Sequence, residues 1–230
     1  MMDLQQSQSF YAWWSGRQRP YTKAEILADG AIHILGLVGA IAAGSILLTF
    51  ALFETAPEAV PALSIYIGTL VVLLSCSMAF NMYPVSRTKM WLARLDQAAI
   101  FLFIAGSYTP FLSVISDTTS GALLMSFVWG ASLVGVGLKL VMPRRSSKLA
   151  IPLYMAIGWS GILVFQSLAE QLPESTMWLI LAGGITYSLG VIFHLWDTLK
   201  FQNVLWHVFV VAGASLHLWA VIDCMVVHRL

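Results

Sequence analysis

The sequence predicts an all-α fold, a bundle of seven membrane-spanning helices. Hydrophobic residues make up 59% of the 230 residues and charged residues 10%, and the mean hydropathy is +0.81. A soluble domain carries about 25% charged residues, so this composition excludes a soluble enzyme or binding module. The apolar residues fall into seven runs of roughly the 20 residues that a helix needs to cross a bilayer.

The seven expected spans follow one another with short connections. In chain order they cover residues 28–53, 61–83, 96–116, 121–142, 149–168, 176–197 and 203–227. The breaks between them fall at residues 54–58, 84–94, 116–120, 143–148, 170–175 and 198–202. These breaks hold the Pro, Ser and charged residues that end helices. Because no connection is long enough to release a second domain, we expect residues 1–230 to form one domain of antiparallel helices.

The breaks alternate in charge, which predicts the orientation. Eleven of the 12 Lys and Arg residues fall on one side of the bundle: Arg17, Arg19, Lys23, Arg87, Lys89, Arg94, Lys139, Arg144, Arg145, Lys148 and Lys200. The other side carries Glu54, Glu58, Asp117, Glu170, Glu174 and the remaining cation, Arg229. Since cations stay on the cytoplasmic side, we expect a cytoplasmic N-terminus and an external C-terminus. A G-protein-coupled receptor has the opposite orientation.

The N-terminal segment, the net charge and the cysteines argue against a signal peptide, nucleic-acid binding and a disulfide framework. Residues 1–24 are polar and aromatic without an apolar core, so we expect a retained cytoplasmic tail, either interfacial or disordered, and no cleavable signal peptide. A net charge of +1 leaves no basic surface for nucleic acid. The expected partners are therefore membrane lipids. Cys76 and Cys224 lie in apolar runs and imply no disulfide framework.

Polar side chains inside the spans are concentrated near the expected cytoplasmic ends. They are Glu25, Asp29 and His33 on the first helix, Ser77 and Asn81 on the second, Asp96 on the third, and Asn203 and His207 on the seventh. Spacings of four residues place each helix's set on one face. Unpaired polar groups are costly in hydrocarbon, which predicts a shared polar pocket. The alternative is interhelical hydrogen bonding, with the carboxylates favoured by helix N-termini.

Three segments resemble a known family. RLDQAAIFLFIAGSYTPF at residues 94–111 resembles a signature of the haemolysin III group of the progestin and adipoQ receptor family. WHVFVVAGASLH at residues 206–217 is similar to its seventh-span motif, and the stretch from Tyr21 to His33 to the opening of its first span. The resemblance implies seven spans in a bacterial inner membrane and a cytoplasm-facing zinc site. It also implies a role in membrane homeostasis for bacterial members, and metal-dependent hydrolysis of lipid amides such as ceramide for other relatives.

The resemblance also implies which residues form that site. The family's zinc ligands are one His of an S-x-x-x-H motif and two of an H-x-x-x-H motif, with the third-span Asp near a metal-bound water. Ser77, Asp96, Glu25 and His207 match the family pattern. Asn81 and Asn203 replace two zinc ligands, Asp29 replaces an Asn, and Gln97 replaces a His. An amide oxygen is a poor zinc donor, and catalytic zinc keeps three protein ligands, so we expect weak or absent zinc binding.

Three interpretations of the altered site follow. The site is vestigial, or it is rebuilt for manganese or iron from His33, Asp29, Asp96 and His207, or the chain is an engineered variant. On the resemblance, Asp96 and Ser77 are the candidate catalytic residues. The cofactor-binding candidates are Glu25, Asn81 and Asn203, and the metal-ligand candidates are His207, His33 and Asp29.

The leading functional hypothesis is a haemolysin III-like membrane protein with a degenerate zinc site. The alternative is a metal-dependent lipid amide hydrolase with a remodelled site. A third hypothesis is a proton or ion pathway with Asp29, Asp96, His33 and His207 as relays. It needs polar residues that continue to the outer leaflet, and the sequence offers few beyond His217.

Overall fold

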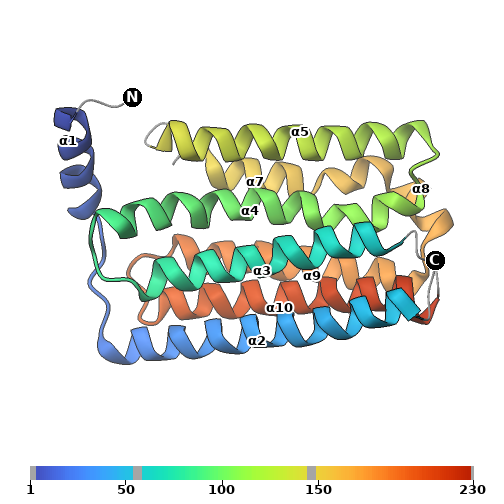
Figure 1. Cartoon of the computed structure of the whole chain (residues 1–230), viewed down its shortest axis with the longest axis horizontal. Helices are drawn as coiled ribbons and strands as arrows, with labels where there is room; N and C mark the ends of the chain where they lie inside the picture. The colour runs from blue at the N-terminus through green and yellow to red at the C-terminus, as the bar shows by residue number, and fades with distance from the viewer. Residues whose placement is uncertain (1–3, 54–58, 144–148, 229–230) are drawn as a thin grey trace.

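The computed structural model describes residues 4–53, 59–143 and 149–228, and every regular element in these ranges is a helix (Figure 1). The long helices are α2 (Lys23–Phe53), α3 (Val60–Met82), α4 (Arg87–Val114), α5 (Thr119–Val141), α9 (Glu174–Leu195) and α10 (Gln202–Ile222). The segment between α5 and α9 consists of α7 (Ala150–Gly158), the 3₁₀ helix η2 (Ser160–Val164) and α8 (Phe165–Gln171). The prediction of an all-α fold is confirmed.

Within the described residues, seven helical segments are long and apolar enough to cross a membrane, and they coincide with the seven expected spans. The chain is therefore an integral membrane protein. The sequence basis for its orientation includes Glu54, Glu58, Arg229 and the cations of residues 144–148, which lie outside the described residues, so the orientation stays a prediction.

Two helices begin earlier than expected because polar side chains cap them. Helix α2 begins at Lys23 rather than at residue 28. The Thr22 hydroxyl accepts a hydrogen bond from the Glu25 N–H (3.3 Å) and the Glu25 carboxylate accepts one from the Thr22 N–H (2.9 Å), which is a capping box. Helix α4 begins at Arg87 rather than at residue 96, since the Ser86 hydroxyl accepts a hydrogen bond from the Lys89 N–H (3.2 Å).

The fifth span is interrupted at its centre, which the sequence did not predict. Helix α7 ends at Gly158, and the chain continues through η2 into α8. The Tyr108 hydroxyl of α4 donates a hydrogen bond to the Gly158 carbonyl (2.6 Å) and accepts one from the Gly161 N–H (2.9 Å). The break thus leaves backbone groups that a neighbouring helix satisfies, as hydrocarbon surroundings require.

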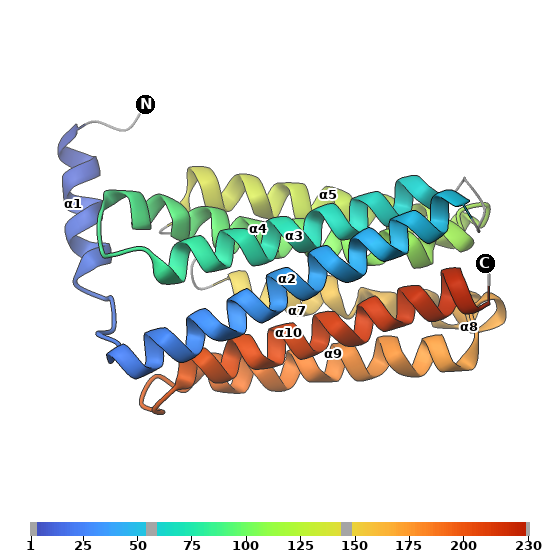
Figure 2. The ribbon, with the colours of Figure 1, turned by 60° about the horizontal axis from the view of Figure 1, so that its bottom comes forward.

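The N-terminal tail contains a helix, α1 (Leu4–Ser15), that lies across one end of the bundle (Figures 1 and 2). Phe10 on this helix is buried, and the guanidinium of Arg94 on α4 lies 5.2 Å from its ring centre and 4.0 Å from that of Trp91. Helix α1 thus contacts α4, and the location of the tail relative to the membrane stays a prediction.

The packing of the long helices brings the polar candidates together. Helix α10 packs against α9 and α2, α2 packs against α3, and α3 packs against α4. The starts of α2, α4 and α10 and the end of α3 all lie at the end of the bundle nearest α1 (Figures 1 and 2). The helices that carry the predicted site therefore meet at one end.

Candidate functional site

Six of the predicted site residues form one connected hydrogen-bond network, here called the polar centre. They are Asp29, His33, Ser77, Asn81, Asn203 and His207. Helix α2 supplies the first two, α3 the next two and α10 the last two. Asp29, His33, Ser77 and His207 are buried, so the network replaces water as the hydrogen-bonding partner of these groups.

The two imidazole rings are held in defined orientations by α2. His207 Nδ1 lies 2.6 Å from Asp29 Oδ1, and His33 Nδ1 lies 2.8 Å from the Asp29 backbone oxygen. A carboxylate and a carbonyl oxygen are acceptors only, so each Nδ1 carries a proton, and in a neutral ring Nε2 then carries a lone pair. The Ser77 hydroxyl has one proton and can donate to only one such lone pair at a time. These two Nε2 atoms converge on the Ser77 hydroxyl oxygen, at 3.1 Å for His33 and 3.4 Å for His207.

The two asparagines at the positions that the family resemblance assigns to zinc ligands are hydrogen-bonded to each other. Asn203 Nδ2 donates to Asp29 Oδ2 (2.9 Å) and to Asn81 Oδ1 (3.0 Å), and Asn81 Nδ2 donates to the Ser77 backbone oxygen (2.9 Å). Their amide groups are thus hydrogen-bonded within the protein. A zinc site of the three-histidine type does not fit this arrangement, because His207 is its one remaining imidazole ligand.

A different donor set fits a divalent metal. Asp29, His33 and His207 each offer one ligand atom, and these atoms lie within 4.8 Å of one another. One carboxylate and two imidazoles hold zinc in some metalloproteases and iron in non-haem oxygenases. The structure therefore places together three of the four residues of the rebuilt-site hypothesis.

Asp96 and Glu25, the other two predicted site residues, have different positions. Asp96 lines the same cavity as His33, Ser77 and His207. Glu25 instead accepts hydrogen bonds from the N–H groups of Thr22 and Phe201 (2.9 and 3.0 Å). It thereby ties the start of α2 to the turn that precedes α10. A cofactor-binding role for Glu25 stays a prediction, and its contacts make it a support that fixes Asp29 relative to His207.

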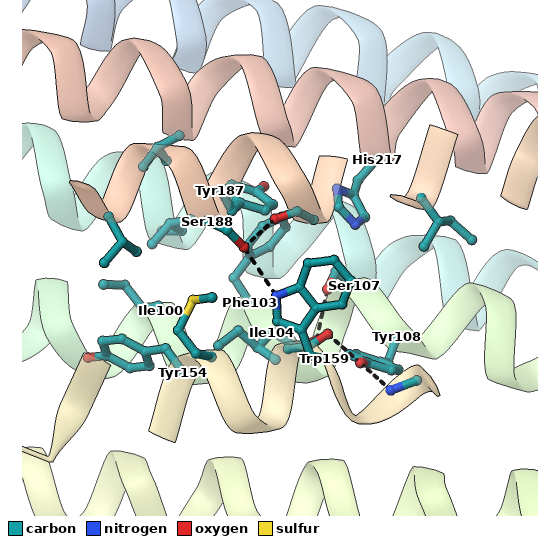
Figure 3. Close-up of a pocket in the computed structure, with 18 of the residues that line it drawn as sticks. Ile100, Phe103, Ile104, Ser107, Tyr108, Tyr154, Trp159, Tyr187, Ser188 and His217 are labelled. Carbon is teal, nitrogen blue, oxygen red and sulfur yellow. Dashed lines mark hydrogen bonds between the residues drawn. The ribbon is translucent and has the colours of Figure 1, made fainter. Parts of the chain in front are cut away.

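A long apolar cavity of about 830 Å³ begins at the polar centre. Two residues of α9 that line it, His194 and Glu174, lie 20 positions apart, which is about 30 Å along a helix. Figure 3 shows a middle part of this cavity, with Ile100, Phe103 and Ile104 opposite Tyr187 and His217. The cavity thus has a polar end, a mainly apolar wall and nearly the length of a membrane span.

Two features of the cavity wall were missed at the level of sequence. Lys139, expected only to orient the chain, is 1% exposed and lines the cavity, and its ammonium donates to Gln97 Oε1 at 2.8 Å. The sequence offers one indication of this burial: Lys139 lies inside the expected span 121–142 and not in the connection that follows it. The second feature is Trp159 beside the break in the fifth span, whose indole N–H donates to the Ser188 hydroxyl at 3.1 Å (Figure 3).

Comparison with known proteins gives consistent similarities. Residues 23–218 match the family described as "Haemolysin-III related". The chain is 32% identical to "Hemolysin-3" of Bacillus cereus over 206 residues, which cover 90% of this chain and 94% of that protein. It is 30% identical to the "Hemolysin-3 homolog" of Bacillus subtilis, with 88% and 95% covered. It is 28% identical to the human "Monocyte to macrophage differentiation factor" over 55% of this chain and 52% of that protein.

Proposed function

The chain belongs to the haemolysin III-related family, and from this premise we propose that it binds one acyl chain of a membrane lipid in its cavity. In this proposal the protein serves membrane homeostasis in the bacterial plasma membrane, and its polar centre holds little or no zinc. The observation that carries the proposal is the elongated apolar cavity that ends at the polar centre.

The shape and lining of the cavity support an acyl chain as its occupant. A volume of about 830 Å³ lies in the range of small-molecule sites, roughly 300–1,000 Å³. Its length of about 30 Å, taken from the helical rise, suits a lipid tail better than a compact polar molecule. The buried Lys139 ammonium and the polar centre lie at one end, where the lipid's polar group would be placed.

Extraction of lipid from the purified protein tests this proposal. We expect mass spectrometry of the full chain, purified in detergent, to detect about one acyl-chain lipid per protein. Ile104→Trp, which adds volume to the cavity wall, is expected to reduce the bound lipid severalfold. Ile46→Trp is the matched control because Ile46 is 60% exposed on α2 and does not line the cavity. Equal lipid content in both variants, at equal folded yield, would contradict the proposal.

A second candidate function is metal-dependent hydrolysis of lipid amides at a remodelled site. The convergence of Asp29, His33 and His207 favours it. A divalent metal held there would supply Lewis acidity and a water of lowered pKa, and Asp96 lines the adjoining cavity wall.

Metal analysis distinguishes this candidate from a metal-free centre. If the site is rebuilt, protein equilibrated with manganese or iron(II) should retain about one ion per chain. Asp29→Asn and His207→Ala should each release that ion without lowering the folded yield, and should abolish amide hydrolysis. Asp117→Asn, in the turn between α4 and α5, is the control that should change neither property. Retention of less than a tenth of an ion by the unaltered protein would reject the candidate.

A further inference from the structure

We propose that Ser77, His207 and Asp29 form a serine-type catalytic triad that hydrolyses fatty-acyl esters without a metal. The proposal rests on the proposed function, because the acyl-chain cavity would hold the ester. Metal-free ester hydrolysis is a different reaction from the one that the family resemblance implies. It rests on the order of contacts: Asp29 Oδ1 to His207 Nδ1 at 2.6 Å, and His207 Nε2 to Ser77 Oγ at 3.4 Å.

The positions of the three residues relative to the cavity match their proposed roles. Ser77 and His207 line the cavity, whereas Asp29 is buried behind His207 and is not among the lining residues. In a serine triad the nucleophile and base meet the substrate, and the carboxylate holds the far side of the imidazole. The 3.4 Å separation of Ser77 and His207 is slightly long, as such hydrogen bonds often are before substrate binds.

The hydrogen bonds of His207 favour its action as the general base. Asp29 accepts a hydrogen bond from the Nδ1–H group of His207. In the neutral ring, the lone pair is then on Nε2, which faces the Ser77 hydroxyl. When Nε2 takes the hydroxyl proton, the Asp29 carboxylate faces the resulting imidazolium and stabilises it. His33 Nε2 lies nearer to Ser77 Oγ, at 3.1 Å, but its Nδ1 faces a neutral carbonyl, which would stabilise an imidazolium less than a carboxylate does. In this proposal His33 is a positioning residue, and the single hydroxyl proton must turn from His33 to His207 before it is transferred.

An amide donor lies beside the nucleophile. Asn81 Nδ2 is 3.4 Å from Ser77 Oγ, one helical turn away on α3. A negatively charged oxygen that forms on the acyl carbon bonded to Ser77 Oγ would need an N–H donor of this kind. An asparagine at this position can supply the donor. A histidine that binds zinc through one ring nitrogen has no N–H at that nitrogen to donate to an oxyanion.

The reaction balances with water as the second substrate. Ser77 Oγ forms a bond to the acyl carbon while its proton moves to His207 Nε2. The ester C–O bond then breaks, and the leaving alcohol takes that proton. Water attacks the acyl-serine ester and gives its proton to His207, which returns it to Ser77 as the fatty acid leaves. No oxidant, reductant or metal enters this sequence.

A covalent probe tests the triad independently of any natural substrate. A long-chain alkyl fluorophosphonate should phosphonylate Ser77 of the purified full chain, with formation of the Oγ–P bond and loss of fluoride and a proton. We expect a single adduct in the intact mass and its location at Ser77 by peptide mass spectrometry. A chelator should leave the labelling rate unchanged. Ester hydrolysis should be blocked in proportion to the label.

Matched variants make the test specific. Ser77→Ala should abolish labelling, and Asp29→Asn, which removes the charge but keeps the shape, should slow it by about a hundredfold or more. Ser126→Ala is the control because Ser126 is exposed, does not line the cavity and bonds only the Ala122 carbonyl among the described contacts. Size-exclusion elution verifies that each variant is folded.

The outcomes separate this proposal from the proposed function. Absence of an adduct on folded protein that still carries its lipid would overturn the triad and leave lipid binding intact. Labelling that Asp29→Asn does not slow, or that falls on a serine other than Ser77, would overturn it as well. Labelling that a chelator abolishes would transfer the chemistry to a metal site. Labelling without any co-purified lipid would support the triad and contradict the proposed acyl-chain binding.

Discussion

Replacement of both asparagines of the polar centre by histidine is expected to restore zinc binding. Asn203 lies one helical turn before His207, and Asn81 lies against Asn203, with 3.0 Å between Nδ2 of Asn203 and Oδ1 of Asn81. Asn81→His and Asn203→His together would therefore add two imidazoles beside His207, the one imidazole present at the zinc-ligand positions that the family resemblance implies. Three imidazoles with one open position are the ligand set of a catalytic zinc site.

The size of the effect follows from the number of ligands gained. A structural four-ligand zinc site contributes about 10–16 kcal/mol of binding free energy at neutral pH, so two ligands correspond to roughly 5–8 kcal/mol. At about 1.4 kcal/mol for each tenfold change in affinity, the gain is roughly four to six orders of magnitude. Loss of the Asn203 hydrogen bonds to Asp29 and Asn81 offsets part of this gain, by about 1–3 kcal/mol for each buried group left unpaired.

Elemental analysis of dialysed protein measures the outcome. We expect well under one zinc per chain in the unaltered protein and about one in the double variant, with each single variant between them. The variant with Ala at positions 81 and 203 loses the same amides without gaining imidazoles, and should stay free of zinc. Stoichiometric zinc in the unaltered protein, or none in a folded double variant, would refute the assignment of Asn81 and Asn203 as the lost ligands.

Three further predictions concern support of the site and topology. Glu25→Gln should lower the free energy of unfolding by about 1–3 kcal/mol, since it weakens charged hydrogen bonds; unchanged stability in detergent would contradict its role as a clamp. Tyr108→Phe should cost about 1–3 kcal/mol because it leaves backbone groups at the helix break unpaired, and Tyr66→Phe, whose hydroxyl contact is 3.5 Å, should cost less; the reverse order would refute this. A reporter fused after Lys148 should be cytoplasmic and one after Leu230 external, and the opposite result at either fusion would overturn the orientation.

The sequence predicted the seven helices well because a membrane span has a simple requirement of length and hydropathy. It predicted helix ends less well, since these depend on single side chains such as Thr22 and Ser86. The break in the fifth span escaped prediction for a related reason. Its backbone groups are satisfied by Tyr108, which is 50 residues away in the chain from Gly158, and no local pattern records such a contact.

The sequence predicted which residues belong to the polar centre, but not which of them are hydrogen-bonded to each other. Four-residue spacings on two helices placed Asp29 with His33 and Asn203 with His207. The spacings could not tell that His33 Nε2 and His207 Nε2 meet at one hydroxyl, because that depends on how α2, α3 and α10 pack. Lys139 was assigned to topology alone, since a cation near the end of a span normally reaches the interface. Its burial against Gln97 depends on the packing of α5 on α4.

The hydrogen bonds of Asn203 show how the residues at positions 29, 81 and 203 depend on one another. Its Nδ2 group donates to Asp29 Oδ2 and to Asn81 Oδ1 at once, which uses both of its protons. A neutral imidazole has one N–H donor and could not serve both partners. Without a metal, a histidine at position 203 would leave the Asp29 carboxylate or the Asn81 amide short of a donor, at a cost of about 1–3 kcal/mol for a buried group. A carboxylate at position 29 is in turn stable here because His207 and Asn203 each donate to it. The amides at positions 81 and 203 thus complete a network centred on Asp29, and the same carboxylate that they support orients His207 toward Ser77.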